Sequence, residues 1–143
     1  MVRFAVETKL HPTEDRVKVT QALRNIAPIG EVQSREIGNL LYLTIESTEI
    51  AALDALYQRF REQRILDVAR KRLQQGVIND TTIFFLNKQT AFVGKVNFCE
   101  VTGESPLGPI RVEIQDDNLP RLIDWLAPYT KKGLEVKLVS DFP

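Results

Sequence analysis

The alternation of apolar and polar residues along the chain predicts its strands. From Val2 to Leu10, every second residue is apolar except Thr8. The residues between them are charged except Ala5. Because a strand directs successive side chains to opposite faces, this pattern predicts a strand with one buried face. Gly38 and Asn39 predict a hairpin turn. Similar patterns predict strands at 31–37, 41–46, 82–86, 96–98, 110–115 and 133–140.

Apolar residues that recur every three or four positions predict two short helices. The first takes Thr13 as its N-cap, has two acidic residues directly after the cap, and ends near Ala27. The second begins at Asn118 and ends at Pro128. The core-facing residues are Val19, Ala22, Leu23 and Ile26 in the first helix and Leu119, Leu122, Ile123 and Leu126 in the second.

The segment from Ser47 to Gln75 has a helical period that changes phase part-way. Apolar residues follow one stripe as far as Phe60, the next positions on that stripe are polar, and apolarity resumes at Ile65. A straight helix of this length would extend about 40 Å at 1.5 Å per residue, which is long for a small domain. We therefore predict a kink or two consecutive helices that meet at residues 61–64, with Ser47 as the first cap and Gly76 just beyond the end.

The predicted strands and helices neither alternate strictly nor repeat. This order favours the α+β class, with an antiparallel or mixed sheet that helices cover on one face. The chain has 143 residues, and we expect it to fold as a single domain over residues 1–143. Its 43% hydrophobic and 27% charged residues are typical of a globular protein and argue against disorder.

The balanced charge of the chain excludes a protein whose whole surface attracts nucleic acid. The chain has 19 basic and 19 acidic residues, so any nucleic-acid site must be a local patch. The single cysteine, Cys99, excludes an intramolecular disulfide and a cysteine-based metal site. The N-terminus differs from a signal peptide, and no apolar run approaches the roughly 18 residues of a membrane span. We therefore expect a cytoplasmic protein without a membrane partner.

Polar residues concentrate directly after the strand predicted at 82–86. Asn87, Lys88 and Gln89 would lie at the edge of the sheet, where Lys95 joins them after a turn at Gly94. Amide and ammonium groups in such a position can hold phosphate oxygens, 2′-hydroxyls or base edges of RNA. In the alternative interpretation, Asn87 and Gln89 satisfy the backbone of a tight turn and the two lysines are solvated.

A second basic feature lies in the long helical segment. Arg59, Arg61, Arg64, Arg70, Lys71 and Arg72 are opposed there only by Glu62 and Asp67. Arginines on a helix can neutralise phosphates, and each such contact steepens the salt dependence of binding. Alternatively, these residues complement the negative end of a helix or pair with acids one turn away.

The sequence lacks the residue patterns of common catalytic and metal sites. Ser105 follows Gly103, but its spacing to Gly108 is too long for a hydrolase elbow, and Pro106 has no N–H to serve as an oxyanion donor. We interpret residues 105–109 as a rigid turn. His11 is the only histidine, so neither a triad nor a multi-histidine metal site can form. We expect no enzymatic activity, no metal and no cofactor.

Four stretches of the chain resemble a small archaeal family of uncharacterised proteins that are described as predicted RNA-binding. They read LHPTEDRVKV at 10–19, RILDVARKRL at 64–73, NKQTAFVGKVNF at 87–98 and SPLGPIRV at 105–112. The resemblance covers nearly the whole chain and supplies no catalytic residue. It implies a fold similar to the large-subunit ribosomal protein that binds 5S RNA. It also implies an RNA partner, ribosomal or transfer RNA, by analogy of fold.

The leading hypothesis is a non-catalytic protein that binds structured RNA through a local basic surface. The alternative is a module that dimerises or binds another protein without nucleic acid. If the lysines at 88 and 95 and the arginine-rich helix share one face, RNA binding is favoured. If they diverge or pair internally with acids, the protein-interaction module is favoured. The residues predicted to contact RNA are Arg64, Arg70, Lys71, Asn87, Lys88, Gln89 and Lys95.

Overall fold

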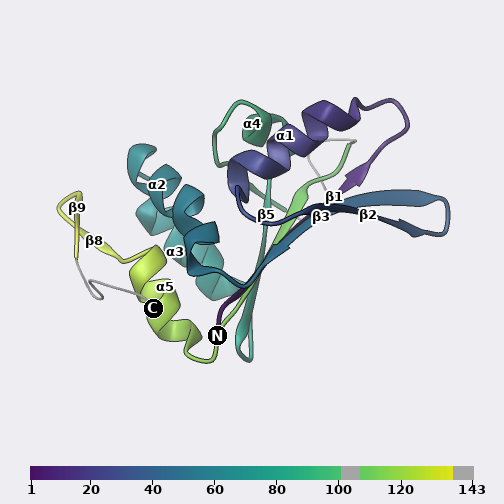
Figure 1. Cartoon of the computed structure of the whole chain (residues 1–143). Helices are drawn as coiled ribbons and strands as arrows, with labels where there is room; N and C mark the ends of the chain where they lie inside the picture. Colours follow the sequence, from purple (N-terminus) through teal and green to yellow (C-terminus); the bar gives the residue numbers. More distant parts are fainter. Residues whose placement is uncertain (101–106, 137–143) are drawn as a thin grey trace.

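The computed structural model describes residues 1–100 and 107–136 of the chain. Its helices gather on one side of a twisted sheet (Figure 1). The helical elements are α1 (Arg16–Ile26), the 3₁₀ turn η1 (Ile50–Leu53), α2 (Asp54–Glu62), α3 (Leu66–Gln75), α4 (Lys88–Phe92) and α5 (Leu119–Leu126). The strands are β1 (Arg3–Leu10), β2 (Val32–Ile37), β3 (Leu40–Ser47), β4 (Val77–Ile78), β5 (Thr81–Leu86), β6 (Phe98–Cys99), β7 (Ile110–Gln115), β8 (Thr130–Lys131) and β9 (Leu134–Glu135).

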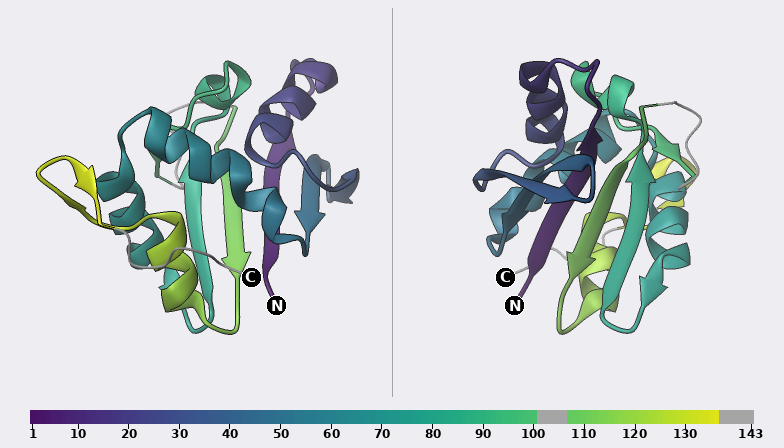
Figure 2. Two further views of the ribbon diagram at one scale, coloured as in Figure 1. Left: turned by 60° about the vertical axis from the view of Figure 1, so that its left-hand side comes forward. Right: turned by 90° about the vertical axis from the view of Figure 1, so that its right-hand side faces the viewer.

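Within the described residues, the main sheet has seven strands in the order β2-β3-β1-β7-β5-β4, and β6 also pairs with β5. Every strand pair is antiparallel, as the registers Val6 with Ile45 and Val6 with Val112 illustrate for the centre of the sheet. The two views in Figure 2 show the strands from different sides, with the helices on one of their faces. The α+β class predicted from the sequence is therefore confirmed, and the sheet is antiparallel.

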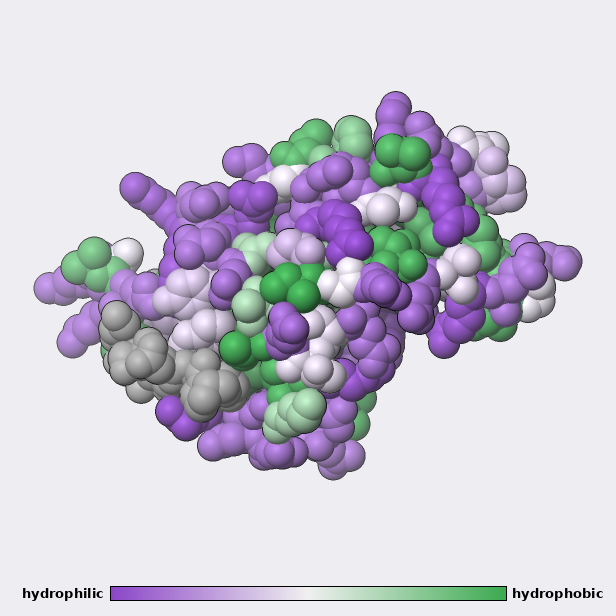
Figure 3. Space-filling model, viewed as in Figure 1, coloured by the Kyte–Doolittle hydropathy of each residue, from purple (hydrophilic) through white to green (hydrophobic). Residues whose placement is uncertain are grey.

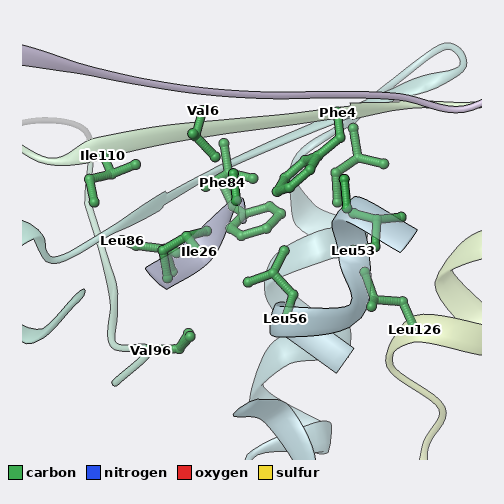
Figure 4. Packing of buried hydrophobic residues seen from close by; sticks show 14 of the residues in the cluster. Phe4, Val6, Ile26, Leu53, Leu56, Phe84, Leu86, Val96, Ile110 and Leu126 are labelled. Carbon is green, nitrogen blue, oxygen red and sulfur yellow. The ribbon is translucent and has the colours of Figure 1, made fainter. Parts of the chain in front are cut away.

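The core lies between the sheet and the helices. Phe4 and Val6 of β1 and Phe84 of β5 point from the sheet towards Leu53 and Leu56 of the helical layer (Figure 4). These side chains are at most 3% exposed, whereas the residues between them on the strands are partly exposed. The alternation seen in the sequence therefore follows the difference between a covered and an open face of the sheet.

Helix α1 begins two residues later than a Thr13 cap requires. Asp15 is the N-cap, and its carboxylate accepts a hydrogen bond from the N–H of Val17 at 2.9 Å. The hydroxyl of Thr13 instead lies 2.8 Å from Nδ1 of His11. Several cap-forming residues follow one another here, and the sequence does not distinguish which one begins the helix.

The long helical segment divides into α2 and α3, as the change of phase predicts. The N–H of Ile65 donates to the carbonyl of Phe60 at 3.0 Å, and the N–H of Arg64 donates to that of Arg61 at 3.1 Å. These two bonds form a Schellman motif, which ends α2. Its residue with positive φ is Arg64, at 56°, a conformation that normally favours glycine.

The ends of this segment differ from the prediction. Ser47 is the last residue of β3 and accepts a hydrogen bond from the N–H of Glu49, so it caps no helix. Glu49 instead precedes η1, a 3₁₀ turn that leads into α2. Gly76 is the C-cap of α3 and has a φ of −89°. Glycine is required here by close packing, because a Cβ would overlap the carbonyl oxygen of Ile83.

Two other predictions differ from the structure. The polar residues after β5 form the short helix α4 and not a turn at the sheet edge. In the described part of the strand predicted at 133–140, Leu134 and Glu135 form β9, which pairs with β8 across a turn at Lys132 and Gly133. Residues 137–140 of this predicted strand, and Ser105 and Pro106 of the predicted rigid turn, lie outside the described residues.

Candidate nucleic-acid interface

Lys88 is buried, so neither interpretation of the sequence places it correctly. Its side chain is 4% exposed, and its ammonium donates to both carboxylate oxygens of Glu14 at 3.1 and 3.2 Å. It also donates to the carbonyls of Lys9 at 2.7 Å and Leu107 at 2.9 Å. Burial lowers the pKa of Lys88, while Glu14 acts in the opposite direction. Lys88 therefore joins three segments of the fold and is enclosed away from any phosphate.

The two amides beside Lys88 lie on α4. Asn87 is the N-cap of this helix and accepts a hydrogen bond from the N–H of Thr90 at 2.9 Å, which is the backbone role of the alternative interpretation. Gln89 is exposed and lines a small hollow between α4 and α1, together with Lys18. Neither amide lies on the arginine-rich helices, so the residues predicted as one interface are divided between two regions.

Several arginines of the basic segment are held by acids and carbonyls from distant parts of the chain. Arg70 donates to Asp124 at 2.9 Å and to the carbonyl of Ala127 at 3.2 Å, which fixes α3 to α5. Arg72 forms an ion pair with Glu100. Arg70 therefore serves the packing of helices, and a carboxylate opposes the charge of both arginines.

Arg61 is the most constrained of these arginines. Its guanidinium lies 3.4 Å from the centre of the Tyr57 ring. All five of its N–H groups are donated within the protein, to Glu135 and to the carbonyls of Tyr57, Trp125 and Leu126. Arg61 therefore fastens α2 to α5 and to β9, and it retains no N–H for a phosphate.

Three of the predicted residues are exposed cations without a hydrogen-bond or ion-pair partner among the described residues: Arg64, Lys71 and Lys95. Arg64 lies at the turn between α2 and α3, and Lys71 lies on the solvent side of α3. The side chain of Gln63 exchanges two hydrogen bonds with the backbone of Val96, at 2.7 and 2.8 Å. These bonds hold the segment that carries Lys95 against the turn that carries Arg64.

The β8-β9 hairpin brings two further lysines to this end of the molecule. Thr130 donates to Asp67 of α3 from both its N–H and its hydroxyl, and Glu135 pairs with Arg61. Lys131 and Lys132 lie at the exposed tip of the hairpin. Sequence reasoning missed them, although the turn residue Gly133 next to two lysines is a signal for an exposed basic hairpin.

We call Arg64, Lys71, Lys95, Lys131 and Lys132 together the corner surface. Figure 1 shows that the α2-α3 turn and the β8-β9 hairpin lie at one end of the helical layer, and that α1 begins at the other. The space-filling view is hydrophilic over α2 and has a small apolar patch on the hairpin (Figure 3). Lys71 lies about two turns along α3 from Arg64, on the exposed side of that helix. Within the described residues, the turn and the hairpin therefore collect unpaired positive charge.

A hollow of about 530 Å³ lies between the α2-α3 turn and the hairpin. We call it the corner pocket. It is lined by Arg61, Arg64, Leu66, Asp67, Thr130, Gly133, Leu134 and Glu135. The corner pocket therefore combines one unpaired guanidinium, two carboxylates and two leucines.

The open face of the sheet has a different charge pattern. Arg3 forms ion pairs with Glu46 at 2.7 Å and Glu113 at 2.9 Å, and Arg35 pairs with Glu7 at 2.6 Å. These cations are already opposed by carboxylates on neighbouring strands, so this face offers little attraction to a polyanion. The corner surface is the better candidate for phosphate contacts.

Among residues 1–100 and 107–136, no group of three or more histidine, cysteine, aspartate or glutamate side chains could hold a metal ion. None of the helices in the same part of the chain is long and apolar enough to cross a membrane. Neither observation adds a further site to the corner surface and the corner pocket.

A family model described as RNA binding matches residues 3–115. The chain belongs to this family. Among its relatives, the UPF0201 protein of Sulfurisphaera tokodaii is 41% identical over 134 residues, which cover 94% of this chain and 92% of that protein. The UPF0201 protein of Thermococcus kodakarensis is 42% identical over 132 residues, which cover 92% and 94%. The resemblance to an archaeal family is therefore confirmed.

Solved structures of similar proteins have the same fold. The UPF0201 protein of Methanococcus jannaschii matches with a TM-score of 0.82 and 33% identity, over 94% of this chain and 98% of that one. A DUF54 protein of Methanothermobacter thermautotrophicus, at 20% identity and a TM-score of 0.60, supports the fold alone. The region that matches the RNA-binding family contains Arg64, Lys71 and Lys95, whereas the β8-β9 hairpin follows it.

Proposed function

We propose that this protein binds RNA through the corner surface and catalyses no reaction. The observation that carries the proposal is that Arg64, Lys71 and Lys95 are exposed and lack an acidic partner among the described residues, whereas neighbouring arginines are paired. Cations that are not already neutralised can contact phosphates without breaking a bond in the protein. Membership of the RNA-binding family supports the same function.

The pairing of Lys88 and of several arginines with acids favours the protein-interaction module by the criterion taken from the sequence. RNA binding is therefore proposed on a changed set of contact residues. Lys88 and Arg70 are excluded because their side chains hold the fold together through Glu14 and Asp124. Asn87 is excluded because it caps α4. Gln89 remains exposed but lies beside α1, away from the corner surface. Lys131 and Lys132 are added from the hairpin.

The partner and cellular setting of this proposal follow from the resemblance of the sequence. An antiparallel sheet with helices on one face is compatible with the expected similarity to the ribosomal protein that binds 5S RNA. We therefore propose a structured RNA, ribosomal or transfer RNA, as the partner in the cytoplasm. A fold analogy carries no residue-level information, so the contact residues rest on the corner surface alone.

The salt dependence of RNA affinity tests this function. Neutralising five phosphates predicts that affinity falls about a hundredfold or more between 50 and 200 mM salt. Fluorescence anisotropy with a labelled transfer RNA would measure this loss. Absence of saturable binding at 50 mM salt would refute the proposal.

A matched pair of double variants tests the location of the interface. Arg64→Gln with Lys95→Gln removes two charges from the corner surface, and Arg16→Gln with Lys18→Gln removes two exposed charges from the first turn of α1. The corner variant should lose affinity and reduce the slope of log K against log salt by nearly two. The α1 variant should retain both. Equal losses in the two variants would mean that total charge and not the corner surface determines binding.

A protein-interaction module is the second candidate, and the edge of the sheet at β2 favours it. Among the described residues strand β2 pairs with β3 alone, and the hairpin between them exposes Ile37 by 51% and Leu40 by 44%. An unpaired edge with apolar residues can add a strand from another chain, including a second copy. Sedimentation equilibrium would show a dimer that Ile37→Lys dissociates. A monomer at all concentrations would exclude self-association.

A further inference from the structure

We infer that the corner pocket binds one unpaired nucleotide of an RNA strand, with a guanine base as its preferred occupant. This inference rests on the proposed function and names the chemistry that the RNA must present. The volume of about 530 Å³ is comparable with that of small-ligand sites and is sufficient for a single nucleotide. Arg64 belongs to both the corner surface and the pocket lining, so an RNA strand that Arg64 contacts would lie beside the pocket.

One of the two cations that line the pocket is available to bind a phosphate. Arg64 lines the pocket, is exposed, and has no ion-pair or hydrogen-bond partner among the described residues. Arg61 also lines the pocket, but its five N–H groups are all donated within the protein. Arg64 can therefore hold the phosphate at the opening, while Arg61 offers only a planar surface.

The surfaces that line the pocket suit the flat face of a base. One side of the Arg61 guanidinium is covered by Tyr57 at 3.4 Å, and Arg61 also lines the pocket. Unpaired bases stack on guanidinium planes as well as on aromatic rings. Leu66 and Leu134 add aliphatic surface, and Leu134 is 73% exposed, so a ligand that covers it would bury apolar area.

The carboxylates determine which base fits. Asp67 and Glu135 line the pocket and would repel a second phosphate, but carboxylates accept N–H groups from base edges. Asp67 accepts the N–H and the hydroxyl of Thr130, at 2.9 to 3.2 Å, and retains acceptor capacity on its second oxygen. Guanine presents adjacent N–H donors on its Watson–Crick edge, which complement a carboxylate. Uracil presents mainly acceptors there.

Another cavity was a weaker candidate. The hollow of about 160 Å³ between α1 and α4 contains Lys88, but every proton of that ammonium is already directed to Glu14 or to a backbone carbonyl. A ligand there would have to displace these bonds. The corner pocket requires no such displacement at Arg64.

Binding of two labelled oligomers tests the inference. The probes are a twelve-residue oligouridine and the same oligomer with one central guanosine, measured by anisotropy at 100 mM salt. We expect the guanosine oligomer to bind about tenfold more tightly, within the range of one bidentate carboxylate contact. A duplex in which the guanosine is paired should lose this advantage, because a paired base cannot enter the pocket. Equal affinity of both oligomers, with normal salt dependence, would overturn the pocket and leave the proposed function intact.

Two variants separate the pocket from general effects. Asp67→Asn keeps an oxygen for Thr130 but presents an amide N–H to the base, so the preference for guanosine over uridine should fall to about twofold or less. Asp54→Asn removes the same charge from an exposed position at the start of α2 and should keep the preference. An unchanged preference in Asp67→Asn would overturn the assignment.

Guanosine monophosphate distinguishes an RNA nucleotide from a free nucleotide. It should compete with the guanosine oligomer only at concentrations at least a hundredfold higher, because it makes none of the other phosphate contacts. Competition at equal concentration would overturn the RNA inference and assign the pocket to a free nucleotide. If neither oligomer nor transfer RNA binds at 50 mM salt, the proposed function fails as well.

Discussion

Replacing Arg64 with glycine should stabilise the protein while it weakens RNA binding. Arg64 is the positive-φ residue of the Schellman motif that ends α2, with φ at 56°. A residue with a Cβ loses about 1–2 kcal/mol in this left-handed conformation. Glycine avoids that strain but loses more backbone entropy on folding, which offsets about 0.5–1 kcal/mol. The net gain in the free energy of unfolding should be about 0.5–1 kcal/mol.

The expected change in melting temperature follows from the size of the chain. An unfolding entropy of about 2.1 cal/mol/K per residue gives about 0.3 kcal/mol/K for a chain of this length. Arg64→Gly should therefore raise Tm by about 2–3 °C in a reversible thermal scan followed by circular dichroism. RNA affinity should fall severalfold at low salt, and the slope of log K against log salt should decrease by about 0.7–0.9.

Arg64→Gln is the matched control because it removes the charge but keeps a side chain at the same backbone conformation. It should lose RNA affinity like the glycine variant and leave Tm nearly unchanged. A glycine variant that is no more stable than the parent would refute the strain argument. A glycine variant with full RNA affinity would refute the role of Arg64 at the corner surface.

Three further predictions concern the fold. Lys88→Met leaves the buried carboxylate of Glu14 without its ion-pair partner. It should reduce the free energy of unfolding, measured in urea, by about 3–5 kcal/mol, and adding Glu14→Leu should recover most of this stability. A small loss in the single variant would contradict the burial of this pair. Gly76→Ala would place a Cβ on the carbonyl oxygen of Ile83, so its Tm should fall by more than 5 °C, and an unchanged Tm would exclude the close contact. Asn87→Ala removes the cap of α4 and should lose about 1 kcal/mol of stability by the same urea assay, more than Gln89→Ala on the exposed side of that helix.

The sequence predicts the strands and long helices well because their burial is periodic. In β1 and β7, one face of the sheet is covered along the whole strand, so the alternation of residues follows the fold directly. The change of phase after Phe60 similarly predicts the turn between α2 and α3, since each helix presents its own stripe to the core. The strands β4, β8 and β9 have two residues each and are too short to show a period.

The candidate site was harder to predict because ion pairs join residues that are distant in sequence. Arg70 lies 54 positions from Asp124, and Lys88 lies 74 positions from Glu14. Local composition counts these cations as free charge, although the fold neutralises them. The sequence could have indicated the role of Asn87, because an asparagine before a short apolar segment is a common N-cap.

The corner surface is therefore proposed from unpaired charge and not from the density of basic residues. The helical segment with the most arginines contributes Arg64 to the corner surface, whereas Arg61 and Arg70 are fixed by Glu135 and Asp124. In the proposed interface Arg61 acts indirectly, because it holds the hairpin that forms one wall of the corner pocket. Most of the proposed phosphate contacts lie in the region that matches the RNA-binding family, while one wall of the pocket comes from the hairpin beyond it. General affinity for RNA and preference for a base should consequently respond to different substitutions, the first to Lys71 and Lys95 and the second to Asp67.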